Sequence, residues 1–461
     1  MTPCWTPRHF AALILYMWVA LLHAGQSLAA APSIPSEELR LSNGLQVILH
    51  RDASLPLVAV NVWYHVGPAN EPSGRSGFAH LFEHLMFEGS LHVGERFDEL
   101  LEAAGATNSN GTTSWDRTNY FQTVPREYLE LVLWIESDRM GFLLDAIDKE
   151  ALDTQREVVL NERRQTYENS PYGPSTLALL DTLFPDGHPY HGAIIGSTAD
   201  LRAATLDHVR GFYEEYYAPS NATLVLAGDF DPEVARRWVA QYFGDLRDRP
   251  RPPALSAVTV PALAGAQRVT VEEPVQLSQV AFGWACPPAY SKADPALQVA
   301  TELLATGRTS RLYRELVVEA RVATDVSAWF DANALASVAV VSATAAEGIP
   351  PARVEQALAA SLARLGQEGP SAIEVARAKR RLLLELNEDL QRLDGPGGES
   401  GRAGLLQRFN HYLGRPNAIT EWHARLDSVT SADVQAVVAE LLGPQRRATV
   451  VTIPKQGNDN G

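Results

Sequence analysis

Apolar and polar residues are arranged along the chain in blocks that predict both strands and helices. Residues 39–52 (LRLSNGLQVILHRD) contain an Asn-Gly turn between apolar runs, and residues 57–67 (LVAVNVWYHVG) continue as a second strand. Residues 107–124 are rich in Thr, Asn and aromatic residues and are expected to be extended, whereas residues 126–144 and 148–168 have helical periodicity. Because strands and helices mix without a regular βαβ alternation, the predicted fold class is α+β.

A long internal repeat indicates that the chain is built from two similar halves. Residues 205–228 (TLDHVRGFYEEYYAPSNATLVLAG) resemble residues 430–453 (TSADVQAVVAELLGPQRRATVVTI), and each copy reads as a helix, a Pro-containing turn and a strand that starts with Ala-Thr. This spacing is far too long for a solenoid repeat and predicts a duplicated domain. Residues 247–266 concentrate Pro, Ala and charge, which is typical of a linker.

Length and composition agree with this division. A chain of 461 residues is too long for one ordinary core, and its 46% apolar content is that of a folded protein. We therefore expect an N-terminal domain at residues 36–247, a linker at residues 248–265 and a C-terminal homologous domain at residues 266–455.

The N-terminus has the features of an export signal. A single arginine, Arg8, precedes an apolar stretch from Phe10 to Leu22, and small residues follow at positions 29–31. Residues 1–30 are therefore expected to be a signal peptide that is cleaved, with the mature protein in the periplasm. The alternative is a retained membrane anchor, but the apolar stretch is short for a bilayer crossing, so no stable membrane insertion is expected.

Charge and cysteine content exclude several classes of function. The net charge is −16, and removal of residues 1–30 takes away one arginine and no acid, which makes the mature chain more negative still. Nucleic acid and anionic membrane surfaces are therefore poor partner candidates. Cys4 lies in the signal, so Cys286 remains alone and the exported protein has no internal disulfide.

The stretch GFAHLFEHLMFEGS, residues 77–90, places three ionisable residues in an apolar run. On a helix, His80 and His84 lie one turn apart on the same face, and Glu83 borders that face. Two imidazoles at this spacing can bind one divalent metal, and a carboxylate that is not a ligand can accept a proton from an activated water. This H-x-x-E-H pattern is the inverted form of the H-E-x-x-H zinc signature. The alternative is a chance pattern of hydrogen-bonded core histidines, but three such groups are costly to bury without a partner.

A catalytic zinc usually has three protein ligands, so a third ligand is expected elsewhere in the chain. Glu157 and Glu162 lie on a predicted helix whose Val158, Val159 and Leu160 can pack inward. Either glutamate could instead be a solvated carboxylate paired with a neighbouring arginine, so these residues alone leave the choice open.

In combination, these motifs resemble a known family. The H-x-x-E-H motif, residues 156–173 (REVVLNERRQTYENSPYG) and residues 188–230, which begin HPYHGAIIGSTADL, resemble the pitrilysin and insulinase zinc peptidases. The resemblance is to the short branch that includes mitochondrial processing peptidase and bacterial two-subunit peptidases. It implies two homologous α+β halves, each an antiparallel sheet with helices packed on one face.

The resemblance also implies roles for individual residues. His80, His84 and Glu162 look like the ligands of a Zn²⁺ cofactor, and Glu83 looks like the catalytic general base. Many relatives have a further glutamate seven residues before the third ligand, which supports the site from behind the ligands. This chain has Gln155 there, and an amide can hydrogen-bond but brings no charge.

Residues Asn110 and Gly111 match positions on the family's exposed edge strand, onto which an extended peptide substrate adds as a further strand. Such backbone pairing gives affinity with little demand on side chains. The alternative for this segment is an ordinary buried strand with a glycine bulge.

One part of the family's active site is missing. In members that are complete in one chain, the second half supplies an Arg and, seven residues later, a Tyr that grip the substrate and help to stabilise the oxyanion. Alignment on SRLYREL places Val317 and Thr324 at these positions, and loss of such donors costs roughly 100- to 1,000-fold in rate. Either the chain is a degenerate hydrolase, or it is the zinc-bearing half of a heterodimer whose paralogous partner supplies the Arg and Tyr. We favour the heterodimer because the zinc motif is intact, and a homodimer is the lesser expectation.

We therefore expect a zinc metalloendopeptidase that hydrolyses peptide bonds in short or unfolded peptides and forms the metal-bearing subunit of a heterodimer. The rival hypothesis is a non-catalytic scaffold or assembly subunit that retains the peptidase fold. The intact Glu83 favours the enzyme.

Overall fold

The computed structural model describes residues 32–455 except 248, 256, 257, 259, 262 and 264. Ile34 and the described residues after it belong to one structural unit. The expected signal peptide lies outside the described residues, and the described part of the expected linker contains no helix or strand. None of the helices in the described ranges has the length and apolar character needed to cross a membrane.

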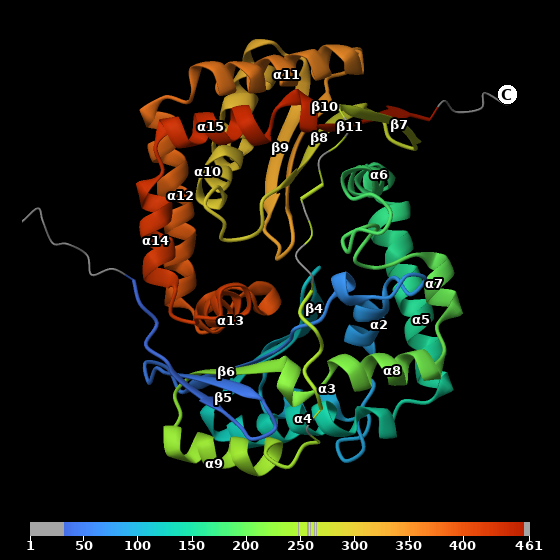
Figure 1. The fold of residues 1–461 in the computed structure, drawn as a ribbon, viewed down its shortest axis with the longest axis vertical. Coiled ribbons are helices and arrows are strands. Elements are labelled where there is room, and N and C mark those ends of the chain that lie inside the picture. The colour runs from blue at the N-terminus through green and yellow to red at the C-terminus, as the bar shows by residue number, and fades with distance from the viewer. Residues whose placement is uncertain are drawn as a thin grey trace, which may run out of the picture. The chain divides into compact units, whose positions relative to one another are not determined.

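The strands of the first half form a six-stranded sheet with the order β1-β2-β6-β3-β5-β4 (Figure 1). Neighbouring strands are antiparallel except for β2 and β6, which are parallel. The strand β4 pairs with β5 alone and forms one edge of the sheet. The bounds are β1 (Glu37–Arg40), β2 (Gln46–Arg51), β3 (Leu57–Tyr64), β4 (Thr107–Thr113), β5 (Thr118–Pro125) and β6 (Ala222–Gly228).

Helices of the first half cover one face of this sheet. The α-helices are α2 (Phe78–Leu85), α3 (Phe97–Ala103), α4 (Leu129–Phe142), α5 (Lys149–Arg163), α6 (Gly173–Leu183), α7 (Thr198–Ala203), α8 (Leu206–Tyr216) and α9 (Pro232–Phe243). Short 3₁₀ turns lie at η1 (Pro68–Asn70), η2 (Arg126–Tyr128), η3 (Leu143–Asp145) and η5 (Pro219–Asn221), and α5 continues into the π-helical turn η4 (Arg164–Glu168). One core joins the sheet to α2, α4, α8 and α9 through residues such as Val60, Phe82, Leu133, Phe212 and Val239.

The second half repeats this architecture. Its five-stranded sheet has the order β7-β11-β8-β10-β9, and only β7 and β11 are parallel. The strands are β7 (Gln267–Glu273), β8 (Gln279–Cys286), β9 (Ala323–Asp331), β10 (Ser337–Ala345) and β11 (Ala448–Pro454). The helices are α10 (Asp294–Ala305), η6 (Tyr313–Glu319), α11 (Pro351–Glu368), α12 (Ala372–Gln391), η7 (Pro396–Gly398), α13 (Gly401–Leu413), α14 (Ile419–Ser428), α15 (Ser431–Leu441) and η8 (Pro444–Arg446).

The repeat found in the sequence corresponds to equivalent elements of the two halves. Thr205 caps α8 and Thr430 caps α15, each by accepting a hydrogen bond from a backbone N–H in the first turn. A Pro-containing 3₁₀ turn follows each helix, and the chain then enters β6 or β11, each of which belongs to the parallel pair of its sheet, β6 with β2 and β11 with β7. The prediction of two homologous α+β halves is confirmed, with the addition of one parallel strand pair in each sheet.

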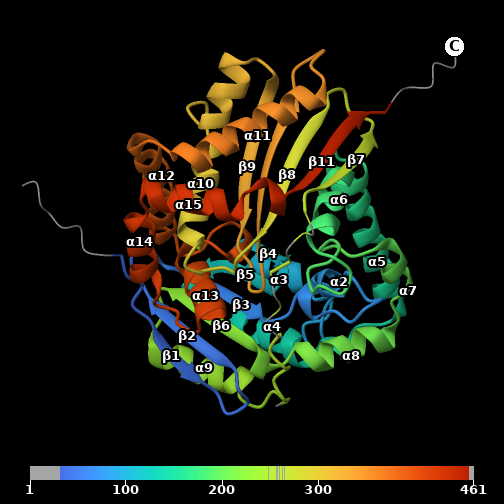
Figure 2. The ribbon, with the colours of Figure 1, turned by 45° about the horizontal axis from the view of Figure 1, so that its top comes forward.

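Each half also covers the second face of the other half's sheet (Figures 1 and 2). Helix α6 of the first half packs on the second sheet, where Leu183 shares a core with Val340 and Val450. Helix α13 of the second half packs on the first sheet, where Phe409 shares a core with Val225. Both sheets are therefore covered on both faces.

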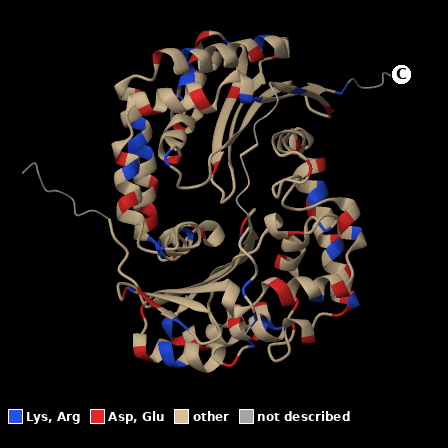
Figure 3. Ribbon diagram, in the orientation of Figure 1, with Lys and Arg blue, Asp and Glu red and all other residues tan. Residues whose placement is uncertain are grey.

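The distribution of charged residues agrees with the burial of both faces of each sheet. Strands β3, β5, β6, β8, β10 and β11 contain no charged residue, and charged residues lie mainly on helices and outer strands (Figure 3). Strands that are buried on both faces are expected to be apolar throughout rather than alternating, because neither face meets water. Strand β6, all of whose residues are buried, is the clearest case.

The exchange of helices predicts a large effect of a substitution on α6. Replacing the fully buried Leu183 by Ala should lower the free energy of unfolding by about 2–5 kcal/mol, because it opens a cavity between α6 and the second sheet. Denaturant unfolding followed by circular dichroism measures this change. The control Leu384→Ala, at a side chain that is 57% exposed, should stay within about 0.5 kcal/mol of the wild type. A Leu183→Ala protein as stable as the control would contradict the packing described here.

Candidate metal centre

Helix α2 carries His80, Glu83 and His84. Phe78, Phe82 and Leu85 are buried in the core, as expected for an amphipathic helix, and the two histidines lie toward the neighbouring helix α5. The positions of the three ionisable side chains are therefore set by a helix that is fixed on its apolar side.

The start of α2 is held by Gly77 and Glu71. Gly77 has a φ of +88°, and a Cβ there would lie 2.6 Å from the carbonyl oxygen of Ile195, so only glycine fits. The carboxylate of Glu71 accepts hydrogen bonds from the backbone N–H groups of Gly77 (2.9 Å) and Ala79 (2.7 Å). Burial raises the pKa of Glu71 to about 8, although these N–H groups act in the opposite direction. The sequence alone gave no sign of this cap, because Glu71 lies in a loop.

His80, His84 and Glu162 come together, although Glu162 is far from the histidines in sequence. Nε2 of His80 lies 3.7 Å from Oε1 of Glu162, and Nε2 of His84 lies 3.3 Å from Oε2 of Glu162. One donor atom from each residue lies within 4.8 Å of the others, and within the described ranges this is the one such group of three. Glu157, the other candidate on α5, is exposed and not part of it.

The spacing and chemistry of these donors fit zinc. Tetrahedral bonds to histidine nitrogen and carboxylate oxygen of about 2.0–2.2 Å separate neighbouring ligand atoms by about 3.3–3.6 Å. The two Nε2–Oε distances are close to this range, and two imidazoles with one carboxylate is a common set of protein ligands for a catalytic zinc that keeps one position free.

The electrostatics of the three donors also suit a cation. Burial lowers the pKa of His80 to about 4, so this imidazole is neutral near pH 7, which is the form that binds metals. The hydrogen bond from His84 holds the pKa of Glu162 below its ordinary value, so this carboxylate is ionised. Burial lowers the pKa of His84, but Glu162 and Glu83 raise it more, so the net shift is upward. The two carboxylates that favour a proton on this ring also attract a metal cation, which replaces the proton when it binds.

Glu83 borders the group without belonging to it. Its Oε2 accepts a hydrogen bond of 2.6 Å from Oγ1 of Thr113, at the end of β4. Burial raises the pKa of Glu83, although the bond from Thr113 acts in the opposite direction. A carboxylate whose pKa is closer to neutrality is better suited to exchange protons at physiological pH. Thr113 was not identified from the sequence.

A cavity of about 260 Å³ opens beside these residues. Its walls come from α2, α5, the end of β4, the turn η4 and a loop before α7: His80, Glu83, Gly111, Thr112, Thr113, Glu162, Thr166, Tyr167, Ile194 and Ile195. The cavity therefore joins the edge strand β4 to the candidate ligands.

Strand β4 lies at the edge of its sheet and is not a buried strand. Asn110 is exposed, and the pairing with β5 is irregular between Thr107 and Asn110. Gly111 is buried against α2, and a Cβ there would lie 3.1 Å from Cγ of Glu83, closer than most real contacts. Oδ1 of Asn110 accepts a hydrogen bond of 2.9 Å from the N–H of Gly111.

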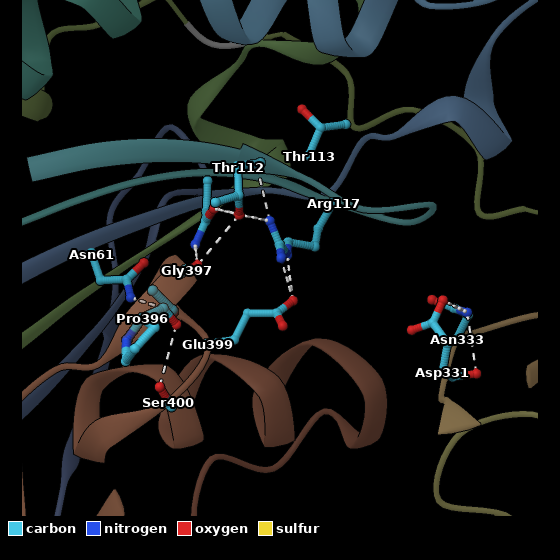
Figure 4. A network of polar contacts seen from close by, with 12 residues as sticks. Asn61, Thr112, Thr113, Arg117, Asp331, Asn333, Pro396, Gly397, Glu399 and Ser400 are labelled. Carbon is cyan, nitrogen blue, oxygen red and sulfur yellow. Dashed lines mark hydrogen bonds and ion pairs between the residues drawn. The ribbon is translucent and has the colours of Figure 1, made fainter. Parts of the chain in front are cut away.

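The turn after β4 is held by the second half of the chain (Figure 4). Arg117 forms an ion pair with Glu399, in which Nε donates to Oε1 at 3.0 Å, and its Nη1 donates to the carbonyl oxygen of Thr112 at 2.8 Å. The carbonyl oxygen of Gly397 accepts hydrogen bonds from Thr112 (3.3 Å) and Asn119 (3.0 Å). The glycine-rich segment around η7 thus fixes the strand that carries Gly111 and Thr113. Sequence reasoning missed Arg117 and Glu399, which have no local pattern and lie 282 residues apart.

Gln155, expected behind the ligands, lies beside one of them. Its side chain hydrogen-bonds His84, which contributes to the raised pKa of that imidazole. Its Nε2 also donates a hydrogen bond to Oε1 of Glu88, a residue that the sequence did not single out.

Val317 and Thr324, which the family resemblance aligns with the expected Arg and Tyr, take part in the packing of the second half. Val317 lies in η6 against the core of that half, and Oγ1 of Thr324 on β9 donates to the carbonyl oxygen of Thr344. Neither residue lines the cavity beside the candidate ligands.

Comparisons with known proteins agree with this geometry. The pattern of the family described as "Insulinase (Peptidase family M16)" matches residues 46–184, and that of the "Peptidase M16 inactive domain" matches residues 203–382. The chain is 32% identical over 333 residues to the zinc protease PqqE of Helicobacter pylori, an alignment that covers 68% of this chain and 72% of that protein.

Solved structures show the same fold. The crystal structure of a protease from Helicobacter pylori matches with a TM-score of 0.84 and 27% identity, over 92% of this chain and 100% of that one. The periplasmic protease PqqL from Escherichia coli matches with a TM-score of 0.71 and 20% identity, over 92% of this chain and 48% of that one. Since the H-x-x-E-H motif lies in the first matched range and the identity to a zinc protease extends along two thirds of the chain, the protein belongs to the insulinase family, peptidase family M16.

Proposed function

We propose that this protein is a zinc-dependent endopeptidase in which His80, His84 and Glu162 hold Zn²⁺ and Glu83 is the general base. The observation that carries the proposal is the convergence of three donor atoms beside a second carboxylate, that of Glu83, and an exposed edge strand. The names of the curated relatives support zinc as the metal.

Bound zinc would supply a Lewis acid that acidifies a water molecule and polarises a peptide carbonyl. Glu83 accepts the proton that the attacking water loses and returns it to the amine of the leaving group. The hydrogen bond from Thr113 holds the Glu83 carboxylate in one orientation while it exchanges this proton. General acid–base catalysis of this kind contributes roughly 100- to 10,000-fold in rate.

The substrate in this proposal is an extended peptide that pairs with the free edge of β4. Asn110 and Gly111 lie on that edge, next to the cavity, so a peptide paired there would pass the candidate ligands. Binding through backbone groups favours short or unfolded peptides, because a folded chain does not offer a free extended segment.

The proposal includes a paralogous partner subunit and a periplasmic location. A partner that carries the Arg and Tyr would complete a site in which Val317 and Thr324 cannot donate as those residues do. The periplasm follows from the expected signal peptide, and the family relative PqqL is described as periplasmic. The rival function, a scaffold without catalysis, keeps the same fold and is separated from the enzyme by the experiments below.

The first test concerns the metal. Replacing Glu162 by Gln should weaken zinc binding at least tenfold, because it removes the charged donor between the two imidazoles. Equilibrium competition with a chromogenic chelator measures the affinity. The control Glu157→Gln removes an exposed carboxylate from the same helix and should bind zinc like the wild type. Equal affinities for both variants would refute the proposed ligand set.

The second test concerns catalysis. Glu83→Gln should retain one zinc per chain but lose roughly 100- to 10,000-fold of the rate on a quenched fluorescent peptide, because the amide cannot accept the proton. The assay is run on the protein alone and mixed with the product of any adjacent paralogous gene. If the wild-type protein cleaves the peptide no faster than Glu83→Gln, both alone and with the paralogue, the result would favour the non-catalytic scaffold function.

The third test concerns the close approach of β4 to α2. Gly111→Ala should lower kcat roughly tenfold with unchanged zinc content, because the new methyl group displaces the Glu83 side chain. Gly211→Ala on α8, where a Cβ meets nothing within 4 Å, is the control and should keep full activity. A Gly111→Ala enzyme with wild-type kcat would show that this contact does not position Glu83.

A further inference from the structure

A carboxylate that no sequence motif indicates, that of Glu88, lies next to Gln155 beside the proposed metal centre. The position seven residues before Glu162 carries the neutral Gln155, and the Nε2 of this residue donates to the carboxylate of Glu88. Among the described side chains, Gln155 is the one that hydrogen-bonds Glu88. His84, Gln155 and Glu88 therefore form a continuous chain of hydrogen bonds.

We propose that Glu88 is a positioning residue of the metal centre, whose carboxylate fixes the Gln155 amide so that its oxygen faces the imidazole of His84. This inference rests on the proposed metal site and adds to it a residue outside the H-x-x-E-H motif. Glu88 then supplies the negative charge that Gln155 lacks.

The direction of the hydrogen bonds follows from the chemistry of an amide. The nitrogen of a glutamine side chain only donates and its oxygen only accepts. An ionised carboxylate only accepts, so the group of Gln155 that faces Glu88 must be the amide NH₂. The amide oxygen of Gln155 is then the group that can accept a hydrogen bond from His84. Without Glu88 both orientations of the amide are open, and in one of them two N–H groups face each other.

This orientation is the one that a metal-binding histidine requires. Such a histidine offers one ring nitrogen to the metal and usually donates the N–H of the other to a carboxylate or carbonyl oxygen. His84 turns Nε2 toward Glu162, 3.3 Å away, so in this proposal the Gln155 oxygen accepts from the N–H of the other ring nitrogen, Nδ1. The chain thereby holds the ring and its tautomer.

Glu88 is itself held firmly. Its N–H donates to the carbonyl oxygen of Leu85 at the end of α2, the helix that carries His84. The next residue, Gly89, has a φ of +123°, and a Cβ there would lie 2.6 Å from the carbonyl oxygen of Gly94. Oγ of Ser90 then donates to the buried Asp138 at 2.5 Å. The backbone at Glu88 is therefore fixed, and the partly buried side chain starts from a defined position beside Gln155.

The test is a double-substitution cycle on zinc affinity, measured by chelator competition on the full mature chain. Glu88→Gln should weaken binding about 10- to 100-fold, the usual effect of losing a partner behind a ligand. Gln155→Glu should also weaken it, because two carboxylates would then face each other. The double variant Glu88→Gln with Gln155→Glu should return to within about threefold of the wild type, since it exchanges amide and carboxylate along the same chain.

A second readout reports the orientation of the ligand. In the cobalt-substituted protein, Glu88→Gln should shift the visible absorption bands of Co²⁺, because the geometry of the His84 bond changes. Glu157→Gln removes an exposed carboxylate of α5 and should leave both the spectrum and the zinc affinity unchanged. Thermal unfolding of the metal-free variants checks that each variant is folded. If the single variant Glu88→Gln does not fold, the zinc affinity of the double variant tests the role of Glu88.

The outcomes separate this inference from the proposed function. Wild-type protein that binds zinc through Glu162, together with Glu88→Gln protein of equal affinity and spectrum, would overturn the role of Glu88 and leave the metal centre standing. A double variant no better than the single variants would also overturn it. Wild-type protein that binds no zinc would refute both proposals.

Discussion

The packing of helix α2 against helix α5 is the constraint on which the site depends. It brings two imidazoles from one helix within 3.7 Å of a carboxylate from the other, and leaves Glu83 beside this group but outside it. Three ionisable groups in so small a volume are costly unless a cation or a set of hydrogen bonds balances them. Much of the surrounding structure serves this balance: Glu71 caps α2, Thr113 bonds Glu83, and Gln155 bonds His84.

The second half of the chain contributes to this site without supplying a ligand. The ion pair between Arg117 and Glu399, with the hydrogen bonds to Gly397, fixes the turn that follows β4. Because Thr113 ends β4 and bonds Glu83, the position of the proposed general base depends on the second half. The proposed catalytic residue, which lies on a short helix, thereby has support from two distant parts of the chain.

The sequence predicted those features that rest on local spacing. The histidines of α2 share a face because of the helical period, and the repeat at residues 205–228 and 430–453 revealed the duplication because it is a contiguous helix, turn and strand. Glu162 could not be separated from Glu157 by periodicity alone, and the family resemblance was needed to choose between them. Glu88 and Arg117 were missed because their partners are 67 and 282 residues away in sequence, and contacts of that kind leave no local pattern.

The exchange of α6 and α13 between the halves has a consequence for how the protein can be divided. The first sheet has an apolar surface, with Ile48, Ala59 and Val225, on which residues of the second half such as Leu406 and Phe409 of α13 pack. A proteolytic or genetic cut that released the first half, with every candidate ligand still in it, would leave this surface open to water and to other chains. We therefore expect the first half to aggregate when it is made alone, and we expect gene fission between the halves to succeed only where both products are made together.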